Sequence, residues 1–287
     1  MVGNMLVQEL SLKFNIAILQ REKSSEKLLN FYKRFLSIEN VYQIDSINNV
    51  GLLKKNIDNI KPTVIINCVG VIKQRVESEN LVNMININSL LPHILDQICA
   101  KREIKLIHLS TDCVFSGVKG DYLETDKPDP VDYYGQTKLL GEIPFSNALT
   151  IRTSFIGPEL FNKKSLFEWI LSQKGNEIEG YKNAIYSGLT TLEFARIMSI
   201  ILYNFIELDG VVHISSSPIT KYDLIKMINN TFDLNIDIKA NYSFKCNRSL
   251  NCNEFYNKTK INVKSWNEMI IDLNEKINRD SVEKFYR

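Results

Sequence analysis

The chain has 287 residues, which is enough for one large α/β domain and a smaller one. Its composition, 44% hydrophobic and 24% charged, is that of an ordinary globular protein. The net charge of +2, from 35 basic and 33 acidic residues, excludes a broad positive field for nucleic acid or an anionic membrane. A phosphate-bearing ligand must therefore be held by local groups. The five cysteines form no C-x-x-C pair, so we expect reduced thiols, a cytoplasmic location and no metal site.

Short apolar runs alternate with amphipathic stretches along most of the chain, which is typical of βαβ units. We expect strands at 15–19, 63–67, 105–110, 149–152 and 210–214. We expect helices at 89–98, 134–142, 192–202 and 221–232. Near-continuous apolar strands fit a parallel sheet covered on both faces, and the strand at 63–67 should be fully buried. Residues 236–257 are polar, and we expect them to be irregular.

These elements predict an α/β protein with a doubly wound, parallel-sheet Rossmann fold and a small C-terminal substrate lobe. Residues 1–156, joined by about 187–215, would form the dinucleotide-binding domain. Residues 157–186 and 216–287 would form the substrate-binding lobe.

The richest stretch for chemistry is 109–117, Leu-Ser-Thr-Asp-Cys-Val-Phe-Ser-Gly, at the end of a predicted strand, where ligands of open α/β sheets bind. Tyr134 and Lys138 follow in a predicted helix, four residues apart and therefore on one face. A tyrosine hydroxyl can protonate a ketone oxygen, but a phenol with a pKa of about 10 is a slow acid near neutrality. The ammonium of Lys138 should lower the pKa of Tyr134, and the hydroxyl of Thr111 or Ser110 should orient the carbonyl.

The Tyr-x-x-x-Lys spacing occurs three times, so by itself it selects no site. The other two pairs are Tyr222/Lys226 and Tyr256/Lys260, which we interpret as a helix surface and a polar loop. Only the first pair follows a strand-end Ser-Thr-Asp at a distance that lets the two segments converge. That context makes the first pair the predicted catalytic one.

The run 63–142 closely resembles the extended short-chain dehydrogenase/reductases, and within them the dTDP-4-dehydrorhamnose reductase family. The segments that carry the resemblance are 66–70, 86–88, 109–117, 122–126, 134–142, 151–154, 187–191 and, more weakly, 248–250. The resemblance implies that the chain is an NAD(P)-dependent oxidoreductase. Its substrate would be a 4-keto-6-deoxy sugar carried on a nucleoside diphosphate, in the synthesis of surface polysaccharide precursors.

The resemblance also implies roles for individual residues around the substrate. Thr111, Tyr134 and Lys138 would be the catalytic triad, and Thr111 and Asp112 would touch the sugar. Arg248 is a candidate ligand of the diphosphate, because arginine grips phosphate through a bidentate fork. A solvated loop arginine is an equal alternative for Arg248.

Other residues are expected to bind the cofactor. By the resemblance, Cys68, Val69 and Gly70 would pass under the nicotinamide ribose, beside Tyr134 and Lys138. Gly70 would permit close approach of the backbone.

Cofactor choice depends on the end of the second strand of the Rossmann fold. That strand ends near Arg21, which suits the 2′-phosphate of NADPH, whereas Glu22 leaves NADH as an alternative. By the resemblance, Asp45 would contact the adenine; a loop-capping role is an equal alternative.

The start of the chain departs from the family pattern. A Rossmann domain opens with a strand and a glycine-rich turn at a helix N-terminus. Gly3 matches the last glycine of that turn and 5–12 the helix behind it, so the predicted fold is N-terminally truncated. One explanation is that the true start lies about a dozen residues upstream, which is the length of a strand and its turn. The other is that the gene is shortened, in which case we expect weak cofactor binding.

Cys113 separates this chain from the nucleotide-sugar 4,6-dehydratases, which resemble the family but carry Asp-Glu after the threonine. A thiol is a poor general base, so reduction or epimerisation is favoured over dehydration. Two alternatives stay open: a nucleotide-sugar epimerase of the same superfamily, and a non-catalytic NADP-binding regulatory subunit. The expected partner is a nucleotide sugar, with no nucleic acid and no membrane, and a homodimer is one open assembly.

Overall fold

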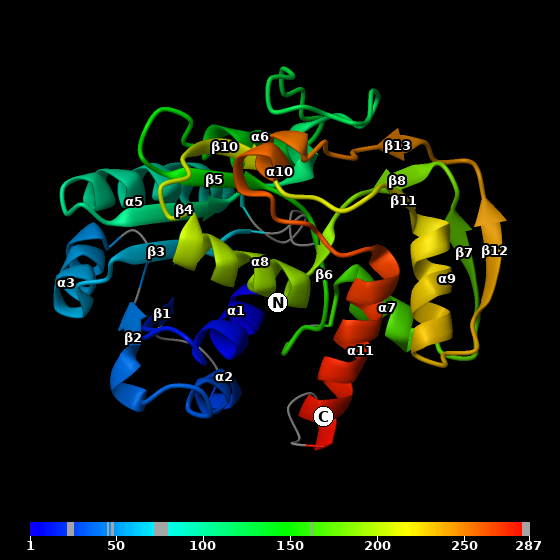
Figure 1. Cartoon of the computed structure of the whole chain (residues 1–287), viewed down its shortest axis with the longest axis horizontal. Coiled ribbons are helices and arrows are strands. Elements are labelled where there is room, and N and C mark those ends of the chain that lie inside the picture. The colour runs from blue at the N-terminus through cyan, green and yellow to red at the C-terminus, as the bar shows by residue number, and fades with distance from the viewer. Residues whose placement is uncertain (22–25, 45, 47–48, 72–79, 162, 283–287) are drawn as a thin grey trace.

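The computed structural model describes residues 1–21, 26–44, 46, 49–71, 80–161 and 163–282. A four-stranded parallel sheet in the order β10-β5-β4-β3 forms its centre (Figure 1). Its strands are β3 (Val64–Asn67), β4 (Lys105–Leu109), β5 (Leu149–Arg152) and β10 (Gly210–His213). The four corresponding strand predictions and the α/β class are confirmed.

Burial differs between the middle and the edge of this sheet. Every residue of β4 is buried, because the strand has a neighbour on each side and helices on both faces. In β3 only Asn67 is buried, so the expectation of a fully buried strand at 63–67 is wrong. The reason is that β3 is the last described strand on its side of the sheet.

A separate two-stranded parallel sheet consists of β1 (Ile18–Arg21) and β2 (Val41–Ile44). The predicted strand at 15–19 therefore begins three residues too early. No strand among the described residues lies between β1 and β3 to join the two sheets. That is where the resemblance would place the first strand of a complete Rossmann sheet.

Helices lie on both faces of the four-stranded sheet and against the smaller sheets (Figure 1). They are α1 (Val2–Leu10), α2 (Glu26–Tyr32), α3 (Val50–Ile60), α4 (Leu81–Met84), α5 (Leu91–Ala100), α6 (Tyr133–Leu140), α7 (Leu166–Ser172), α8 (Thr191–Asn204), α9 (Lys221–Thr231), α10 (Asn253–Thr259) and α11 (Trp266–Val282). Shorter turns are the 3-10 helices η1 (Ile38–Asn40) and η4 (Asp112–Val114) and the π-helical η3 (Ile85–Leu90). No helix in the described ranges is long and apolar enough to cross a membrane.

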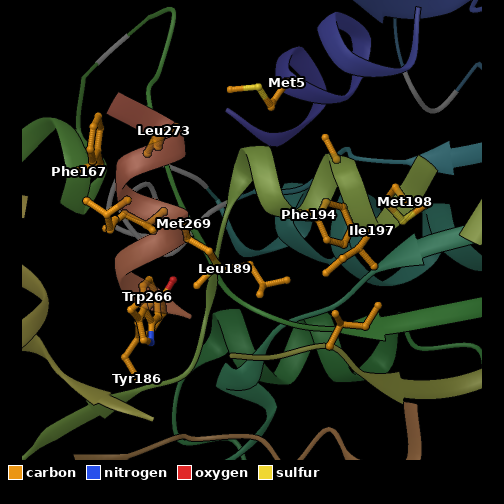
Figure 2. Packing of buried hydrophobic residues seen from close by; sticks show 14 of the residues in the cluster. Met5, Phe167, Tyr186, Leu189, Phe194, Ile197, Met198, Trp266, Met269 and Leu273 are labelled. Atoms are coloured by element: carbon orange, nitrogen blue, oxygen red, sulfur yellow. The ribbon is translucent and has the colours of Figure 1, made fainter. Parts of the chain in front are cut away.

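Two buried apolar clusters hold these layers together. Ile107 and Ile151 face the larger cluster, to which α1 contributes Met5 and α8 contributes Phe194 (Figure 2). Leu106, the neighbour of Ile107 on β4, faces the smaller cluster under α3 and α5. Alternate residues of one strand thus meet helices on opposite faces, as in a doubly wound fold.

The remaining strands pair across long stretches of sequence. They are β6 (Phe155–Ile156) with β9 (Leu189–Thr190), β7 (Glu177–Tyr181) with β12 (Asp237–Asn241), and β8 (Ala184–Tyr186) with β11 (Ile219–Thr220) and β13 (Cys246–Asn247). The expectation that 236–257 is irregular is wrong, because β12, β13 and the start of α10 lie there. β12 is largely exposed and is defined by its pairing with β7, so it carries no local apolar pattern.

A buried ion pair joins the carboxyl ends of the central strands. Nε and Nη2 of Arg152 each donate to a carboxylate oxygen of Glu142 at 2.8 Å, and each side chain is only 5% exposed. Glu142 also accepts a hydrogen bond from Ser110 Oγ at 2.6 Å, and Arg152 Nη1 lies 3.3 Å from His213 Nε2. Burial and the charge of Arg152 lower the pKa of His213 to about 3, so that ring is neutral near pH 7.

Replacing Arg152 tests this network. Arg152→Met should lower the free energy of unfolding by about 3–5 kcal/mol, because it leaves the Glu142 carboxylate buried without its counter-charge. Urea unfolding measures the change. The matched control is Arg102→Met, which removes an ion pair with Asp58 at the surface and should cost less than about 1 kcal/mol. Similar losses in both variants would contradict a special role for the buried pair.

Candidate active site

Two hydroxyl groups meet where β4 ends and α6 begins. Thr111 caps η4, and its Oγ1 accepts a hydrogen bond from the Cys113 amide at 3.2 Å. Tyr134 lies in the first turn of α6, whose cap Asp132 accepts from the Gly135 amide at 2.8 Å. The side chain of Thr111 lies close enough to the Tyr134 phenol to influence its pKa. A carbonyl oxygen bound between them would contact both.

Glycines let α6 approach its neighbours this closely. A β-carbon at Gly135 would lie 2.2 Å from the carbonyl oxygen of Cys113, which no other residue tolerates without a backbone shift. At the far end of α6, a β-carbon on Gly141 would lie 1.9 Å from the Asn88 carbonyl oxygen. The helix that carries Tyr134 therefore touches η4 at one end and η3 at the other.

Lys138 lies one helical turn after Tyr134 and is buried. Its amine donates a hydrogen bond to the carbonyl oxygen of Leu109, the last residue of β4, at 2.6 Å. Burial lowers the pKa of Lys138 to about 8, although the nearby Glu142 and Cys68 oppose the shift. The amine is thus anchored to the strand that leads into Thr111.

The pKa of Tyr134 is raised, chiefly by burial and also by Cys113 and Asp112, while the side chain of Thr111 opposes the rise. The net shift is therefore opposite in direction to the lowering that we expected from Lys138. The lysine ammonium is directed to the strand backbone, and the immediate surroundings of the phenol are acidic. A phenol in this environment keeps its proton near neutrality and is a weaker acid than free tyrosine, but an alkoxide is a still stronger base and could take that proton.

The segment after β3 offers an open backbone beside this site. Asn67 accepts a hydrogen bond from the Val69 amide at 3.1 Å, which shapes the turn. Val69 is 45% exposed, and a β-carbon on Gly70 would make only an ordinary contact, at 3.5 Å from Asn88. The coulombic interaction between Cys68 and Lys138 brings this segment to the same site. The residues present fit the nicotinamide end of a dinucleotide.

Asn88 is a residue that the sequence prediction left out of the site. Its side chain accepts from the Val71 amide at 2.8 Å and donates to Thr137 Oγ1 at 3.2 Å. It thereby ties the segment after β3 to α6. Asn88 lies in η3, and single π-helical turns are frequent at functional sites. Its only signal in the sequence was membership of the resembling segment 86–88.

The other predicted cofactor residues are spread more widely. Gly3 lies in the first turn of α1 with its α-carbon beside Cys68, and a β-carbon there would sit 3.5 Å from that side chain. Packing against Cys68 therefore does not itself demand a glycine. Arg21 ends β1, as expected for the second Rossmann strand, but its side chain and Asp45 lie outside the described residues.

The predicted substrate residues lie along η4. Asp112 is buried and accepts a hydrogen bond from Thr111 at 3.2 Å. Arg248 is half-buried; its Nε donates to the Phe115 carbonyl oxygen at 2.8 Å and its Nη1 lies 3.8 Å from Cys113 Sγ. Arg248 is therefore held against the site segment and is not a solvated loop residue.

The other two Tyr-x-x-x-Lys pairs have different surroundings. Tyr222 lies under the amine of Lys182, and Lys226 is exposed on α9. Tyr256 lies in α10 and Lys260 is its C-cap, so this pair ends a helix and the polar-loop interpretation is wrong. Tyr222 does follow a strand-end hydroxyl, that of Thr220 in β11, but this hydroxyl donates a hydrogen bond to Asp223 at 2.6 Å.

The chain matches one protein family over most of its length. A family model described as the RmlD substrate binding domain matches residues 23–277. The chain is 43% identical over 75 residues to the probable low-salt glycan biosynthesis reductase Agl14 of Haloferax volcanii, covering 24% of this chain and 25% of that protein. It is 46% identical over 55 residues to a dTDP-4-dehydrorhamnose reductase of Burkholderia thailandensis, covering 17% and 18%. These matches span a quarter or less of each relative.

The fold is shared with solved structures over nearly its whole length. The dTDP-4-dehydrorhamnose reductase of Bacillus anthracis, solved in complex with NADP, superposes with a TM-score of 0.74. The alignment has 20% identity and covers 92% of this chain and 99% of that one. The predicted Rossmann-type fold is confirmed by this similarity.

Gly135→Ala tests the close approach of α6 to η4. The variant should lower the free energy of unfolding by about 1–3 kcal/mol, because the new methyl group forces the two backbones apart. The matched control is Gly51→Ala in α3, where the nearest atom would lie 3.7 Å away and stability should rise by about 0.4–1 kcal/mol. Urea unfolding measures both. A Gly135→Ala protein as stable as the parent would show that the contact is not as close as described.

Proposed function

The chain belongs to the family of the RmlD substrate binding domain, and on that premise we propose that it reduces the ketone of a 4-keto-6-deoxy sugar carried on a nucleoside diphosphate. The observation that carries the proposal is the meeting of Thr111, at the end of β4, with Tyr134 in the first turn of α6, with Lys138 buried and bonded to the Leu109 carbonyl oxygen. The names of its relatives, a glycan biosynthesis reductase and a dTDP-4-dehydrorhamnose reductase, support the same reaction class.

The chain's own residues would supply the proton and position the ketone. A bound reduced nicotinamide would supply the hydride. The hydroxyls of Thr111 and Tyr134 would both hydrogen-bond the ketone oxygen, and the phenol of Tyr134 would donate its proton as negative charge grows there. Lys138 would hold the end of β4 through the Leu109 carbonyl and add positive charge behind the phenol. Burial of the site strengthens each of these interactions.

The proposed cofactor is NADPH, with NADH as the alternative. The B. anthracis structure of the same fold holds NADP. In this chain, Cys68, Val69 and Gly70 would lie under the nicotinamide ribose, and Gly3 would lie near the phosphates. Arg21 at the end of β1 would contact the 2′-phosphate, and Asp45 the adenine. Titration with NADPH and NADH followed by nicotinamide fluorescence would rank the two cofactors.

The substrate would lie between η4 and a second lobe made of 157–186 and 216–287. This division is supported by strand pairing, because β7 and β8 of the first segment pair with β11, β12 and β13 of the second. Asp112 and Arg248 would contact the substrate from η4 and from the end of β13. A role in making surface polysaccharide precursors in the cytoplasm fits the name of the H. volcanii relative and the five free cysteines.

Two other functions are distinguishable from the proposed one by assay. A nucleotide-sugar epimerase would convert its substrate without net consumption of NADPH. A non-catalytic NADP-binding subunit would bind cofactor with no turnover, although it would have no need for a buried Thr-Tyr-Lys set. A homodimer is a further hypothesis, which light scattering would test.

Tyr134→Phe is the direct test of proton donation. Turnover should fall by about 100-fold or more, because the phenyl ring has no proton to give. Cofactor affinity should stay within a few-fold of the parent, since the ring keeps its packing. Oxidation of NADPH with a dTDP-4-keto-6-deoxy sugar measures the first and fluorescence titration the second. The control is Tyr133→Phe, which changes an adjacent residue that is 58% exposed and should keep full turnover. Wild-type rates in Tyr134→Phe would refute the assignment of Tyr134 as the proton donor.

The pH profile tests Lys138. Turnover at saturating substrate should decline as pH rises through about 8, because the ammonium that stands behind Tyr134 loses its proton there. Lys138→Arg keeps its charge across that range and should move the decline to higher pH. Initial rates of NADPH oxidation across the range give the profile. A profile that does not change near pH 8, or one unaltered in Lys138→Arg, would contradict an electrostatic role for this residue.

A further inference from the structure

The sheet of β8, β11 and β13 brings two cationic side chains to one face. The residues just before Lys221 and Arg248 both stand opposite Ile185, in the middle of β8. Lys221 is the first residue of α9, and its amine lies over the ring of Tyr186, the last residue of β8. Arg248 follows β13 directly, and its amide donates to the Ile185 carbonyl oxygen at 3.4 Å, which continues the register and sets Arg248 opposite Tyr186. Opposed residues share a face of a sheet, so Arg248 lies on the side of the Tyr186 ring that Lys221 contacts.

The amine of Lys221 has an aromatic ring for a partner. Its Nζ lies 3.6 Å from the centroid of the Tyr186 ring. No carboxylate of the described chain comes within ion-pair distance of it, 4.0 Å. Burial lowers its pKa to about 8, and Asp112, Cys113 and Cys246 oppose the shift.

Lys182 provides a comparison on the same lobe. Its amine also lies over a tyrosine ring, that of Tyr222, at 3.9 Å from the centroid. Unlike Lys221, it is also paired with a carboxylate, that of Asp223, at 3.0 Å. One ring-stacked ammonium of this lobe thus has its counter-charge within the protein, and the other does not.

Tyr186 adds an unpaired hydroxyl to the same face. The residue is 7% exposed, and its hydroxyl has no hydrogen-bond partner among the described residues. Its ring packs on Trp266 in the core, with centroids 5.4 Å apart (Figure 2). A buried hydroxyl without a partner costs about 1–3 kcal/mol, which a bound acceptor would recover.

Arg248 also has donor capacity left over. Its Nε donates to the Phe115 carbonyl oxygen, and its Nη1 makes only a long contact with the Cys113 sulfur. Among the described residues its Nη2 has no hydrogen-bond acceptor. The guanidinium is therefore oriented by η4 while one terminal nitrogen stays available.

We propose that Lys221 is a substrate-binding residue and that, together with Arg248, it binds the diphosphate of the nucleotide sugar. The identity of the ligand rests on the proposed function. An ammonium and a guanidinium on one face, without carboxylate partners, match the charge and the acceptor oxygens of a diphosphate. The hydroxyl of Tyr186 supplies a further donor. The diphosphate lies on the side of these cations, so that the sugar extends over Asp112 toward Tyr134.

Calorimetric titration of the whole chain with dTDP, UDP and NADPH tests the proposal. Lys221→Met should weaken binding of the nucleoside diphosphates by about 10- to 100-fold, the range for a hydrogen bond to a charged group. Affinity for NADPH should stay unchanged, which separates the substrate's phosphates from those of the dinucleotide. Lys221→Arg should keep most of the affinity, because it retains the charge.

Two measurements separate binding from folding. Lys182→Met, which removes the other ring-stacked lysine, should leave dTDP affinity unchanged. The melting temperature of Lys221→Met should not fall, because the variant removes a buried ammonium that has no ion pair. A drop in affinity that accompanies intact folding and is confined to Lys221→Met supports the proposal.

Several results would overturn it. The first is an unchanged dTDP affinity in Lys221→Met, and the second is an equal loss of dTDP affinity in Lys182→Met. The third is a Lys221→Met variant that loses affinity for NADPH instead of dTDP, and the fourth is a parent chain that binds no nucleoside diphosphate. A parent that binds dTDP through Lys221 but oxidises no NADPH with a keto sugar would refute the proposed reductase and leave this site standing.

Discussion

Glu142 accepts hydrogen bonds from Ser110 on one side and from Arg152 on the other, and so fixes the ends of β4 and β5 against the helix that precedes it. A carboxylate this deeply buried is tolerated because the guanidinium supplies both an opposite charge and directed donors. Thr111 follows Ser110 directly, and α6 carries Tyr134. One buried charge pair thus fixes both segments that contribute hydroxyl groups to the candidate site.

Burial shifts the two ionisable groups of α6 in opposite directions. It raises the pKa of the Tyr134 phenol and lowers that of the Lys138 ammonium, because in each case the charged form is poorly solvated. The result is a phenol that keeps its proton and an ammonium that begins to lose its own near pH 8. Such a pair is suited to giving a proton to a developing alkoxide, which is the direction that a reduction needs.

The overall charge of the molecule gives no guidance to where an anionic substrate would bind. With a net charge of +2 spread over the chain, an anion must find individual donors. Lys221 and Arg248 are the donors proposed for it; the first lies over the Tyr186 ring at the start of α9, and the second follows β13, which pairs with β8. In the proposed complex, Asp112 of η4 lies between the residues that bind the diphosphate and Tyr134, which donates the proton.

The sequence determined the central strands and the choice of Tyr134 and Lys138, because both depend on local order: apolar runs of strand length, and a helix that follows a strand-end Ser-Thr-Asp. Tertiary structure decided the rest. The direction of the Tyr134 pKa depends on where the Lys138 amine finds its acceptor, on Leu109 of another element. The pairing of β12 with β7, and the contact of Lys221 with the Tyr186 ring, join residues whose separation in sequence carries no periodic signal. Contacts of that kind arise only when the chain is packed, since they depend on register between strands and on burial that no single segment contains.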